Sequence, residues 1–349
     1  MNGSFPNDKN FLMLAPMAGI TDSPFRILSK KGGAQVVFTE MLSSMALAHD
    51  SRRTTAMLRF SDEERPIIAQ IFGSNTIAIE KSVGIIAQLG FDGVNLNFGC
   101  PARKIMKSSS GSAALKDLNI YKEVIRAACK AAEPLKIPVS VKTRPGITPR
   151  KNLAAEVSKI AEGEGASMII LHARFASQKH SGYISYEALS SASRCVKIPV
   201  VANGGISDEE TAHRILTETG CRGIMIGRAA IGDFGIFGRI LHYIKTGEKL
   251  PAPSREEKIN MYKQHARLSC GFYGEKRGII ILRKLAAFYL KGMPGAKSAR
   301  ELINKSETLE DFNKALDTVF NFNVNDDADT FHHNVATCHR GTLAARGED

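Results

Sequence analysis

The chain has 349 residues, 43% of them hydrophobic, and its 47 Lys and Arg against 35 Asp and Glu give a formal net charge of +12 at pH 7. This excess of positive charge favours polyanionic partners, and no stretch of about 18 apolar residues lacks a charge, which argues against a membrane span. Six cysteines without a C-x-x-C pair argue against a disulfide framework or a zinc site. Residues 1–10 contain no targeting signal. We therefore expect a cytoplasmic protein without a metal ion.

Short apolar runs alternate with helical stretches from Phe11 to about Arg239. Most runs are continuously hydrophobic, which is typical of strands covered by helices on both faces. Eight such strands separated by helices predict an α/β fold, a (β/α)8 TIM barrel. The expected strands are Phe11–Pro16, Gln35–Thr39, Ile67–Phe72, Gly93–Asn97, Pro138–Lys142, Met168–His172, Pro199–Asn203 and Gly223–Gly227.

The pattern changes after Arg239. Pro251–Ser254 is typical of a linker, and Ser254 with Glu257 has the spacing of a helix capping box. From Lys245 to Phe320 there are 15 Lys and Arg and nine Asp and Glu, interleaved with aromatic residues. The sequence predicts a barrel over 1–245, a small, basic, all-helical domain over 246–320 and a flexible tail over 321–349. The charge of the helical domain suits a polyanionic partner, and composition alone does not choose between RNA, DNA and an anionic surface.

Several predicted strands end in polar or glycine-containing clusters, and in a TIM barrel these ends form the active-site rim. Asn203-Gly204-Gly205 and Gly227-Arg228 follow the last two strands, where barrels often bind phosphate. Each cluster alone has an equally good steric explanation, since glycine-rich turns are common. No Gly-Lys dipeptide, G-x-G-x-x-G or H-E-x-x-H motif occurs, which disfavours P-loop, Rossmann and zinc-protease chemistry.

Other polar side chains leave strands at the same rim. Lys142 could face an anion such as a reduced flavin or lie in solvent. His172 could act at the site or make a structural hydrogen bond, and Gln70 could bond a ring carbonyl or cap a turn. Cys100 lies between a glycine and a proline on a rim loop, so it is the best candidate for the reacting side chain. The other cysteines of the barrel are interpreted as small core residues.

Six segments carry a resemblance to a known family: Leu14–Arg26, Asn95–Pro101, Val141–Arg144, Asn203–Ile206, Ile226–Arg228 and Leu282–Gly295. In this order they resemble the motifs of the tRNA-dihydrouridine synthase family, nearest its bacterial B-type members. The resemblance covers roughly residues 11–319. Two positions depart from it: Leu285 stands where members often carry histidine, and Gly205 where they often carry an acidic residue.

The resemblance implies an FMN enzyme that reduces the C5–C6 bond of specific uridines in tRNA to 5,6-dihydrouridine, with NADPH or NADH as reductant. It implies that Cys100 gives the proton to C5 after hydride reaches C6. It implies that Asn97, Arg144, Arg283 and Lys284 lie near the RNA. The residues implied around FMN are Pro16, Met17, Ala18, Gln70, Lys142, His172, Asn203, Gly204, Gly205, Gly227 and Arg228.

We expect a monomer whose partners are tRNA and NAD(P)H. Two other hypotheses stay open. An FMN-dependent barrel acting on a small molecule would share the flavin site but has no use for the basic helical domain. A non-catalytic RNA-binding barrel protein would bind no flavin.

Overall fold

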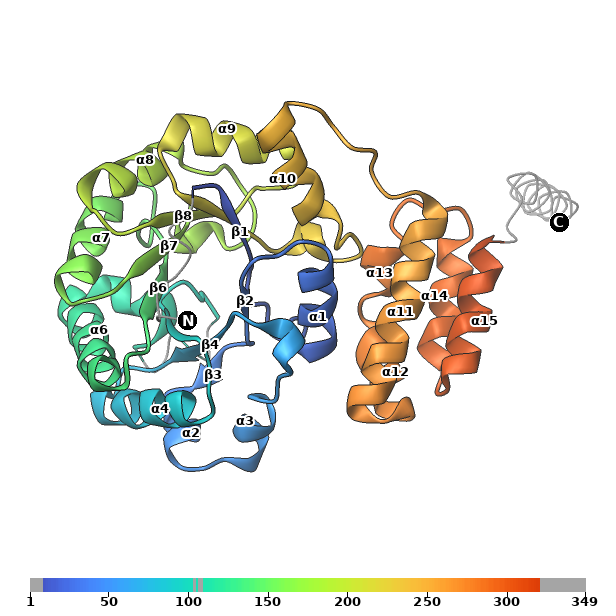
Figure 1. Ribbon diagram of the computed structural model, residues 1–349, viewed down its shortest axis with the longest axis horizontal. Coiled ribbons are helices and arrows are strands. Elements are labelled where there is room, and N and C mark those ends of the chain that lie inside the picture. The colour runs from blue at the N-terminus through green and yellow to red at the C-terminus, as the bar shows by residue number, and fades with distance from the viewer. Residues whose placement is uncertain (1–8, 103–104, 106–108, 321–349) are drawn as a thin grey trace, which may run out of the picture. The chain divides into compact units, whose positions relative to one another are not determined.

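The structure is a computed structural model that describes residues 9–102, 105 and 109–320. Its contacts divide the chain into two compact units, Met1–Ala252 and Pro253–Asp349. The first is a ring of parallel strands with helices outside it, and in the second the described residues form helices and no strand (Figure 1). The predicted barrel followed by a helical domain is therefore confirmed. The predicted flexible tail, 321–349, lies outside the described residues.

All eight predicted strands are present, three with the predicted bounds and five with ends shifted by a residue or two. The strands are β1 (Phe11–Leu14), β2 (Val37–Phe38), β3 (Leu42–Ser43), β4 (Ile67–Phe72), β5 (Gly93–Asn97), β6 (Val139–Thr143), β7 (Met168–His172), β8 (Val200–Asn203) and β9 (Gly223–Ile226). The short β3 was not predicted. It continues the pairing of β2 along β4 after an interruption, where the Thr39 hydroxyl accepts the backbone N–H of Gln70 at 3.0 Å in place of a carbonyl.

The sheet closes into a barrel. The strand order is β1-β9-β8-β7-β6-β5-β4-β2, with every pairing parallel. Between its two ends, a parallel bridge joins Met13 to Val36, and Leu14 N–H donates to Val36 O at 2.9 Å. Closure removes the exposed edges that an open sheet would leave.

Helices follow most strands and lie outside the ring (Figure 1). The α-helices of the barrel unit are α1 (Ser23–Lys31), α2 (Ser44–Ala48), α3 (Arg52–Ala56), α4 (Thr76–Gln88), α6 (Leu118–Ala132), α7 (Ala154–Gly163), α8 (Tyr186–Cys195), α9 (Glu209–Thr219) and α10 (Ile236–Thr246). Short 3-10 helices are η1 (Asp62–Glu64), η2 (Gly111–Lys116), η3 (Glu133–Leu135), η4 (Ala176–Gln178) and η5 (Arg228–Ala230). Side chains cap the first turns of several helices, as Asp22, Asn75 and Asp208 do for α1, α4 and α9.

The helical unit contains five α-helices among the described residues. They are α11 (Arg255–Tyr273), α12 (Glu275–Arg283), α13 (Ala286–Tyr289), α14 (Ala296–Lys305) and α15 (Leu309–Phe320). The predicted capping box is confirmed, because Ser254 and Glu257 exchange hydrogen bonds of 2.7 and 3.2 Å at the start of α11. The units divide between Ala252 and Pro253, later than the boundary predicted after residue 245, because α10 continues to Thr246 and a coil segment follows it. Over the described residues, no helix is both long and apolar enough to cross a membrane.

Candidate active site at the C-terminal ends of the strands

The C-terminal ends of the strands bring the predicted polar side chains together inside the barrel. Inward-facing positions recur every second residue along a strand. Ile68, Ile170 and Val201 belong to the apolar cluster that fills the barrel. The next inward positions on the same strands are polar, and the neighbouring strands supply two more polar side chains in register. These side chains are Gln70, His172, Asn203, Asn97 and Lys142.

Lys142 is buried at the end of β6, with 8% of its surface exposed. Its Nζ donates to Asn203 Oδ1 at 2.6 Å, and Asn203 Nδ2 donates to Met225 O at 2.8 Å. Burial lowers the pKa of Lys142 to about 7, and Arg144 acts in the same direction, whereas the charge of Cys100 opposes it. Of the two sequence interpretations, the solvated lysine is therefore excluded.

Arg144 is also buried, with 1% of its surface exposed. Its guanidinium donates four hydrogen bonds of 2.6 to 3.2 Å, all to backbone carbonyls: those of Gly99, Arg174, Phe175 and Lys179. Burial lowers the pKa of Arg144 to about 10. Four of the five guanidinium N–H groups are thus used within the protein. Arg144 therefore holds two loops together and adds a positive charge to the site. This geometry differs from the RNA contact expected from the sequence.

His172 ends β7 and packs against Gly204. Its Nε2 is buried and has no hydrogen-bond partner among the described residues. Burial, and then the charges of Lys142 and Arg144, lower the pKa of His172 well below its usual value, so the imidazole is neutral near pH 7. An unsatisfied buried nitrogen is costly and requires an explanation. It marks a place where a ligand can complete the hydrogen bonding.

Gly204 and Gly205 have the left-handed backbone that favours glycine, with φ of +101° and +74°. A Cβ on Gly204 would lie 2.8 Å from His172 Nε2, and one on Gly205 would lie 2.8 Å from Ile184 Cγ2. Either contact would force the neighbouring side chain to move. The departure from the family pattern at Gly205 therefore has a local reason, because an acidic side chain would be strained in this backbone.

Cys100 is a partly exposed free thiol on the loop after β5. The peptide frame around it is held on both sides. Asn97 Oδ1 accepts the N–H groups of Gly99 and Cys100, each at 3.0 Å, while the N–H and Oγ of Ser112 donate to Cys100 O at 3.0 and 3.1 Å. The charge of Cys100 influences the pKa values of both Lys142 and Arg144, so the thiol lies within electrostatic range of these two cations.

The loops after β1 and β9 meet beside these residues. Met17 N–H donates to Thr21 Oγ1 at 2.9 Å, and a Cβ on Gly227 would lie 3.7 Å from Met17 Sδ. Pro16 and Ala18 flank Met17 and are partly or fully exposed. Arg228 is exposed and donates Nη2 to His180 O at 2.8 Å.

Sequence reasoning missed the contribution of the loop after β7. Arg174 donates Nε to Gly182 O at 3.0 Å, so together with Arg144 and Arg228 it makes three guanidiniums that hold this loop by its carbonyls. The ring of His180 lies 6.3 Å from that of His172. Because the three arginines bind backbone carbonyls, no side-chain pattern in the sequence predicts these contacts.

Comparison with known proteins identifies the family. The family model described as "Dihydrouridine synthase (Dus)" matches residues 13–325. A Rickettsia bellii protein named "Probable tRNA-dihydrouridine synthase" is 36% identical over 294 residues, covering 84% of this chain and 89% of the relative. The Pseudomonas aeruginosa "tRNA-dihydrouridine synthase B" is 36% identical over 296 residues, covering 85% and 88%. The chain belongs to the dihydrouridine synthase family.

Solved structures with little sequence identity share the fold. Histamine dehydrogenase from Rhizobium sp. 4-9 has a TM-score of 0.53 at 13% identity, covering 74% of this chain and 49% of that one. Morphinone reductase has a TM-score of 0.50 at 11% identity, covering 74% and 91%. At this identity the likeness concerns the barrel alone.

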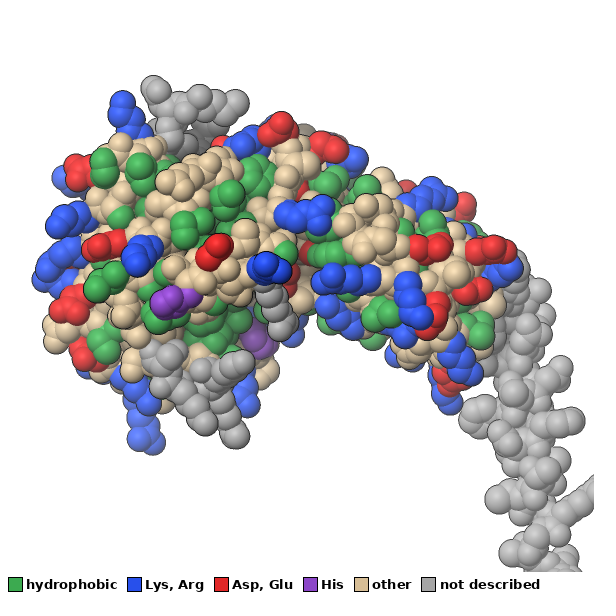
Figure 2. Space-filling view, turned by 90° about the horizontal axis from the view of Figure 1, so that it is seen from below, with side chains coloured by type: hydrophobic (Ala, Val, Ile, Leu, Met, Phe, Trp, Pro, Cys, Tyr) green, Lys and Arg blue, Asp and Glu red, His purple; other side chains and the backbone are tan. Residues whose placement is uncertain are grey.

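The predicted RNA residues of this dihydrouridine synthase family member differ in accessibility. Lys284 is exposed, whereas Arg283 is partly buried and donates Nη2 to Ser306 O at 2.6 Å. Leu285, the other departure from the family pattern, is 2% exposed and packs in the helical unit. On the face in Figure 2, basic side chains of this unit are interspersed with acidic ones.

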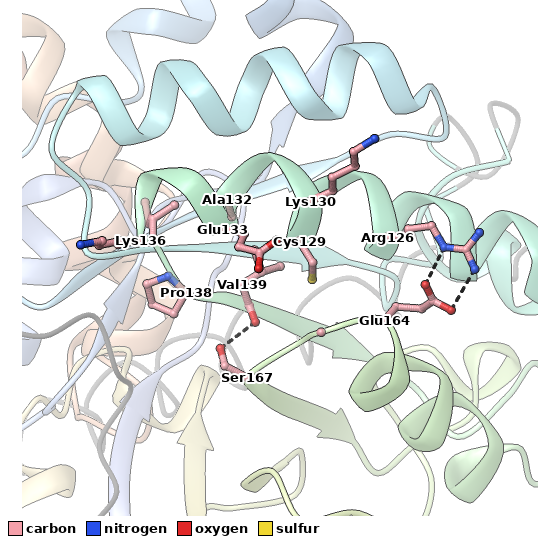
Figure 3. A pocket seen from close by; sticks show the side chains of 12 residues that line it. Arg126, Cys129, Lys130, Ala132, Glu133, Lys136, Pro138, Val139, Glu164 and Ser167 are labelled. Atoms are coloured by element: carbon pink, nitrogen blue, oxygen red, sulfur yellow. Dashed lines mark hydrogen bonds and ion pairs between the residues drawn. The ribbon is translucent and has the colours of Figure 1, made fainter.

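A separate cavity of about 730 Å³ lies where strands begin rather than where they end. It is lined by the C-terminal part of α6 and the residues at the starts of β6 and β7 (Figure 3). Arg126 and Glu164 at its rim form a two-bond ion pair of 2.7 and 3.2 Å. None of the predicted site residues lines it.

Proposed function

We propose that this chain reduces uridines in tRNA to 5,6-dihydrouridine, with FMN bound at the C-terminal ends of the strands and NADPH or NADH as reductant. Membership of the dihydrouridine synthase family over residues 13–325 is the observation that carries the proposal. Relatives similar over most of their length are named for action on tRNA, which supports the choice of substrate.

The residues present fit a flavin nucleotide. Buried cations without carboxylate partners, the unsatisfied Nε2 of His172 and the side-chain-free cradle at Gly204 suit an anionic ligand with hydrogen-bonding ring atoms. The residues that would hold it are Pro16, Met17, Ala18, Gln70, Lys142, His172, Asn203, Gly204, Gly205, Gly227 and Arg228. When bound and reduced, FMN supplies the hydride that the C6 atom of uracil accepts.

The chain's own residues would supply the second half of the reduction. The anion left on the ring needs one proton at C5, and the Sγ–H of Cys100 gives it, so the S–H bond breaks as the C–H bond forms. The resulting thiolate is stabilised by the positive charges of Lys142 and Arg144, which interact with it electrostatically. Its reprotonation from solvent restores the enzyme.

RNA binding is assigned to residues 246–320, together with the barrel mouth. The base must be extruded from the RNA to reach a site inside a barrel, at a cost of a few kcal/mol. The basic residues of the helical unit would offset that cost through phosphate contacts. Lys284 is a candidate because it is exposed, whereas Arg283 is used internally. Replacing Lys284 by Gln should reduce the salt dependence of tRNA affinity by about one unit of log–log slope.

Purified protein supplied with NADPH and an unmodified tRNA transcript tests the proposal. Nucleoside mass spectrometry should detect dihydrouridine in the transcript, while free uridine and UMP in parallel reactions stay unreduced. Reduction of the small molecules but not the transcript would favour a small-molecule oxidoreductase. A protein that binds tRNA but shows no flavin absorbance, even after incubation with FMN, would favour the non-catalytic alternative.

A further inference from the structure

A chain of buried side-chain hydrogen bonds crosses three strands beneath the candidate site. Ser140 on β6 donates its hydroxyl to Val94 O at 3.2 Å, and Asn95 on β5 donates Nδ2 to Ser140 Oγ at 2.8 Å. Gln70 on β4 donates Nε2 to Asn95 Oδ1 at 2.7 Å. Asn97, at the end of β5, donates Nδ2 to Gln70 Oε1 at 2.8 Å. This hydrogen-bond chain therefore connects the middle of β6 with the loop that follows β5.

The direction of every bond in this chain is fixed by the backbone. Asn97 Oδ1 accepts the N–H groups of Gly99 and Cys100, and a backbone N–H can only donate. The amide nitrogen of Asn97 must therefore face Gln70, which presents its oxygen there and its nitrogen to Asn95. Each amide has one orientation that satisfies its neighbours on both sides, and the Ser140 hydroxyl ends the series on a carbonyl.

These side chains replace an apolar layer of the barrel core. Gln70, Asn95 and Ser140 are aligned across β4, β5 and β6, and each is at most 1% exposed. Elsewhere the interior is filled by residues such as Ile170 and Met225. Polar groups at such depth contribute little stability even when fully bonded, and they penalise any rearrangement that breaks a bond. What this layer adds to the fold is a unique orientation of the side chains above it.

We propose that Ser140 and Asn95 are positioning residues for Cys100, acting through Gln70 and Asn97 to fix the peptide that carries the thiol. This inference rests on the proposed function, in which Cys100 gives a proton to C5. A proton donor must be held in a productive geometry, and a misplacement of about 1 Å can reduce the rate by about 100-fold. The hydrogen-bond chain begins on β6, the strand next to the one that leads to the thiol. Ser140 and Asn95 are fully buried, so the substrate contacts neither of them.

Ser140→Ala tests the proposal, with Ser167→Ala as the matched control. Both serines donate to a strand carbonyl, Ser140 to Val94 O and Ser167 to Val139 O at 2.9 Å, but Ser167 lies outside the hydrogen-bond chain. Ser140→Thr keeps the hydroxyl and should rescue the variant. One readout is mass-spectrometric hydrogen exchange of the amides of residues 99 and 100. The other is single-turnover oxidation of the pre-reduced holoenzyme by unmodified tRNA.

In Ser140→Ala we expect exchange of these two amides to quicken by about ten-fold, the equivalent of one lost neutral hydrogen bond. We expect product formation to slow by about ten-fold, because the donor is less well held. Ser167→Ala and Ser140→Thr should match the wild type in both measurements. If Ser140→Ala does not fold, Ser140→Cys takes its place, since a thiol is a weak hydrogen-bonding group of similar size.

Exchange and turnover no different from those of Ser167→Ala would overturn the inference. So would faster exchange with unchanged turnover, if Cys100→Ala abolishes turnover in the same assay, because the chain would then hold the loop without affecting catalysis. Unchanged turnover in Cys100→Ala itself points instead to failure of the proposed donor. In the wild type, rapid exchange at residues 99 and 100 would contradict the fixed frame without any variant.

Discussion

The two ends of the barrel differ in whether their charged residues are paired, and β6 runs from one end to the other. Val139, where β6 begins, lines the cavity of Figure 3 together with Arg126 and Glu164. The carboxylate of Glu164 lies 2.7 Å from Arg126 and 3.6 Å from Lys122. Near the other end of β6, Lys142 is buried. Among the described residues it forms no salt bridge, and neither do Arg144 or His172.

The difference supports the proposal that the ligand binds at the end with unpaired buried charge rather than in the cavity at the opposite end. The charges that line the cavity are either paired, as Arg126 and Glu164 are, or exposed to solvent, as Lys130, Glu133 and Lys136 are, so they need nothing further. Burying a cation without a counter-ion is expensive, and such cations cluster at sites where a ligand or a reaction uses them. The buried Arg26 supports this contrast from within the barrel, because it has a carboxylate partner, Glu64, at 2.5 Å.

Cys100→Ala should have the largest effect at the charged end. It removes the proposed acid but no residue of the proposed flavin site, so FMN content and flavin reduction by NADPH should persist. Dihydrouridine formation in single-turnover experiments with tRNA should fall by about 10²–10⁴-fold, the usual contribution of a general acid. Cys129→Ala, which alters a cysteine lining the cavity at the opposite end, is the control and should retain the wild-type rate. A wild-type rate in Cys100→Ala would redirect the search for the donor to His172.

Lys142→Met should weaken the site while stabilising the flavin-free protein. The pKa of Lys142 falls from its ordinary 10.5 to about 7 on folding, so the unfolded chain binds more protons between these values and wild-type stability rises with pH across that interval. At pH 7 and below, the variant should gain up to about 5 kcal/mol, less its lost hydrogen bond to Asn203. The gain should vanish towards pH 10.5. Thermal unfolding across pH measures this gain in stability. Flavin titration should show weaker FMN retention, or stopped-flow mixing with NADPH should show slower flavin reduction.

A variant that is destabilised at every pH would show that Lys142 is compensated in the folded protein. The comparison between the two ends of the barrel would then lose its main example.

The strands and the rim were predictable because hydrophobic runs and the residues that end them are local features of the sequence. Four site residues were predictable because each lies within two residues of the end of its strand, on the same end of the barrel: Gln70, Lys142, His172 and Asn203. The division of the second strand into β2 and β3 was not predictable, because it depends on a side-chain hydroxyl substituting for a ladder carbonyl.

Asn95 and Ser140 were missed for another reason. Each is a single polar residue inside an apolar strand, a pattern that local reasoning interprets as a strand and nothing more. Their role emerges only when the register aligns them with Gln70. A useful signal would have been the coincidence of polar residues at inward positions on three consecutive strands, which requires the sheet order as well as the sequence.

Glu164→Gln, at the cavity end, should have the smallest effect and the opposite pH dependence. Arg126 holds the pKa of Glu164 below its ordinary 4.5, so the ion pair stabilises the fold above that value, and the stabilisation is lost as the pH falls through the lowered pKa. The variant should therefore melt slightly below the wild type at neutral pH and match it in acid, whereas Lys142→Met differs most from the wild type at and below neutral pH. Exposed pairs contribute little, so turnover and FMN content should be unchanged. Parallel melting curves of the two variants from acid to alkaline pH would measure both stability changes, the gain in Lys142→Met and the loss in Glu164→Gln. A loss of turnover in Glu164→Gln would mean that the paired end of the barrel influences catalysis, and that the separation between a ligand-binding end and a structural end is incomplete.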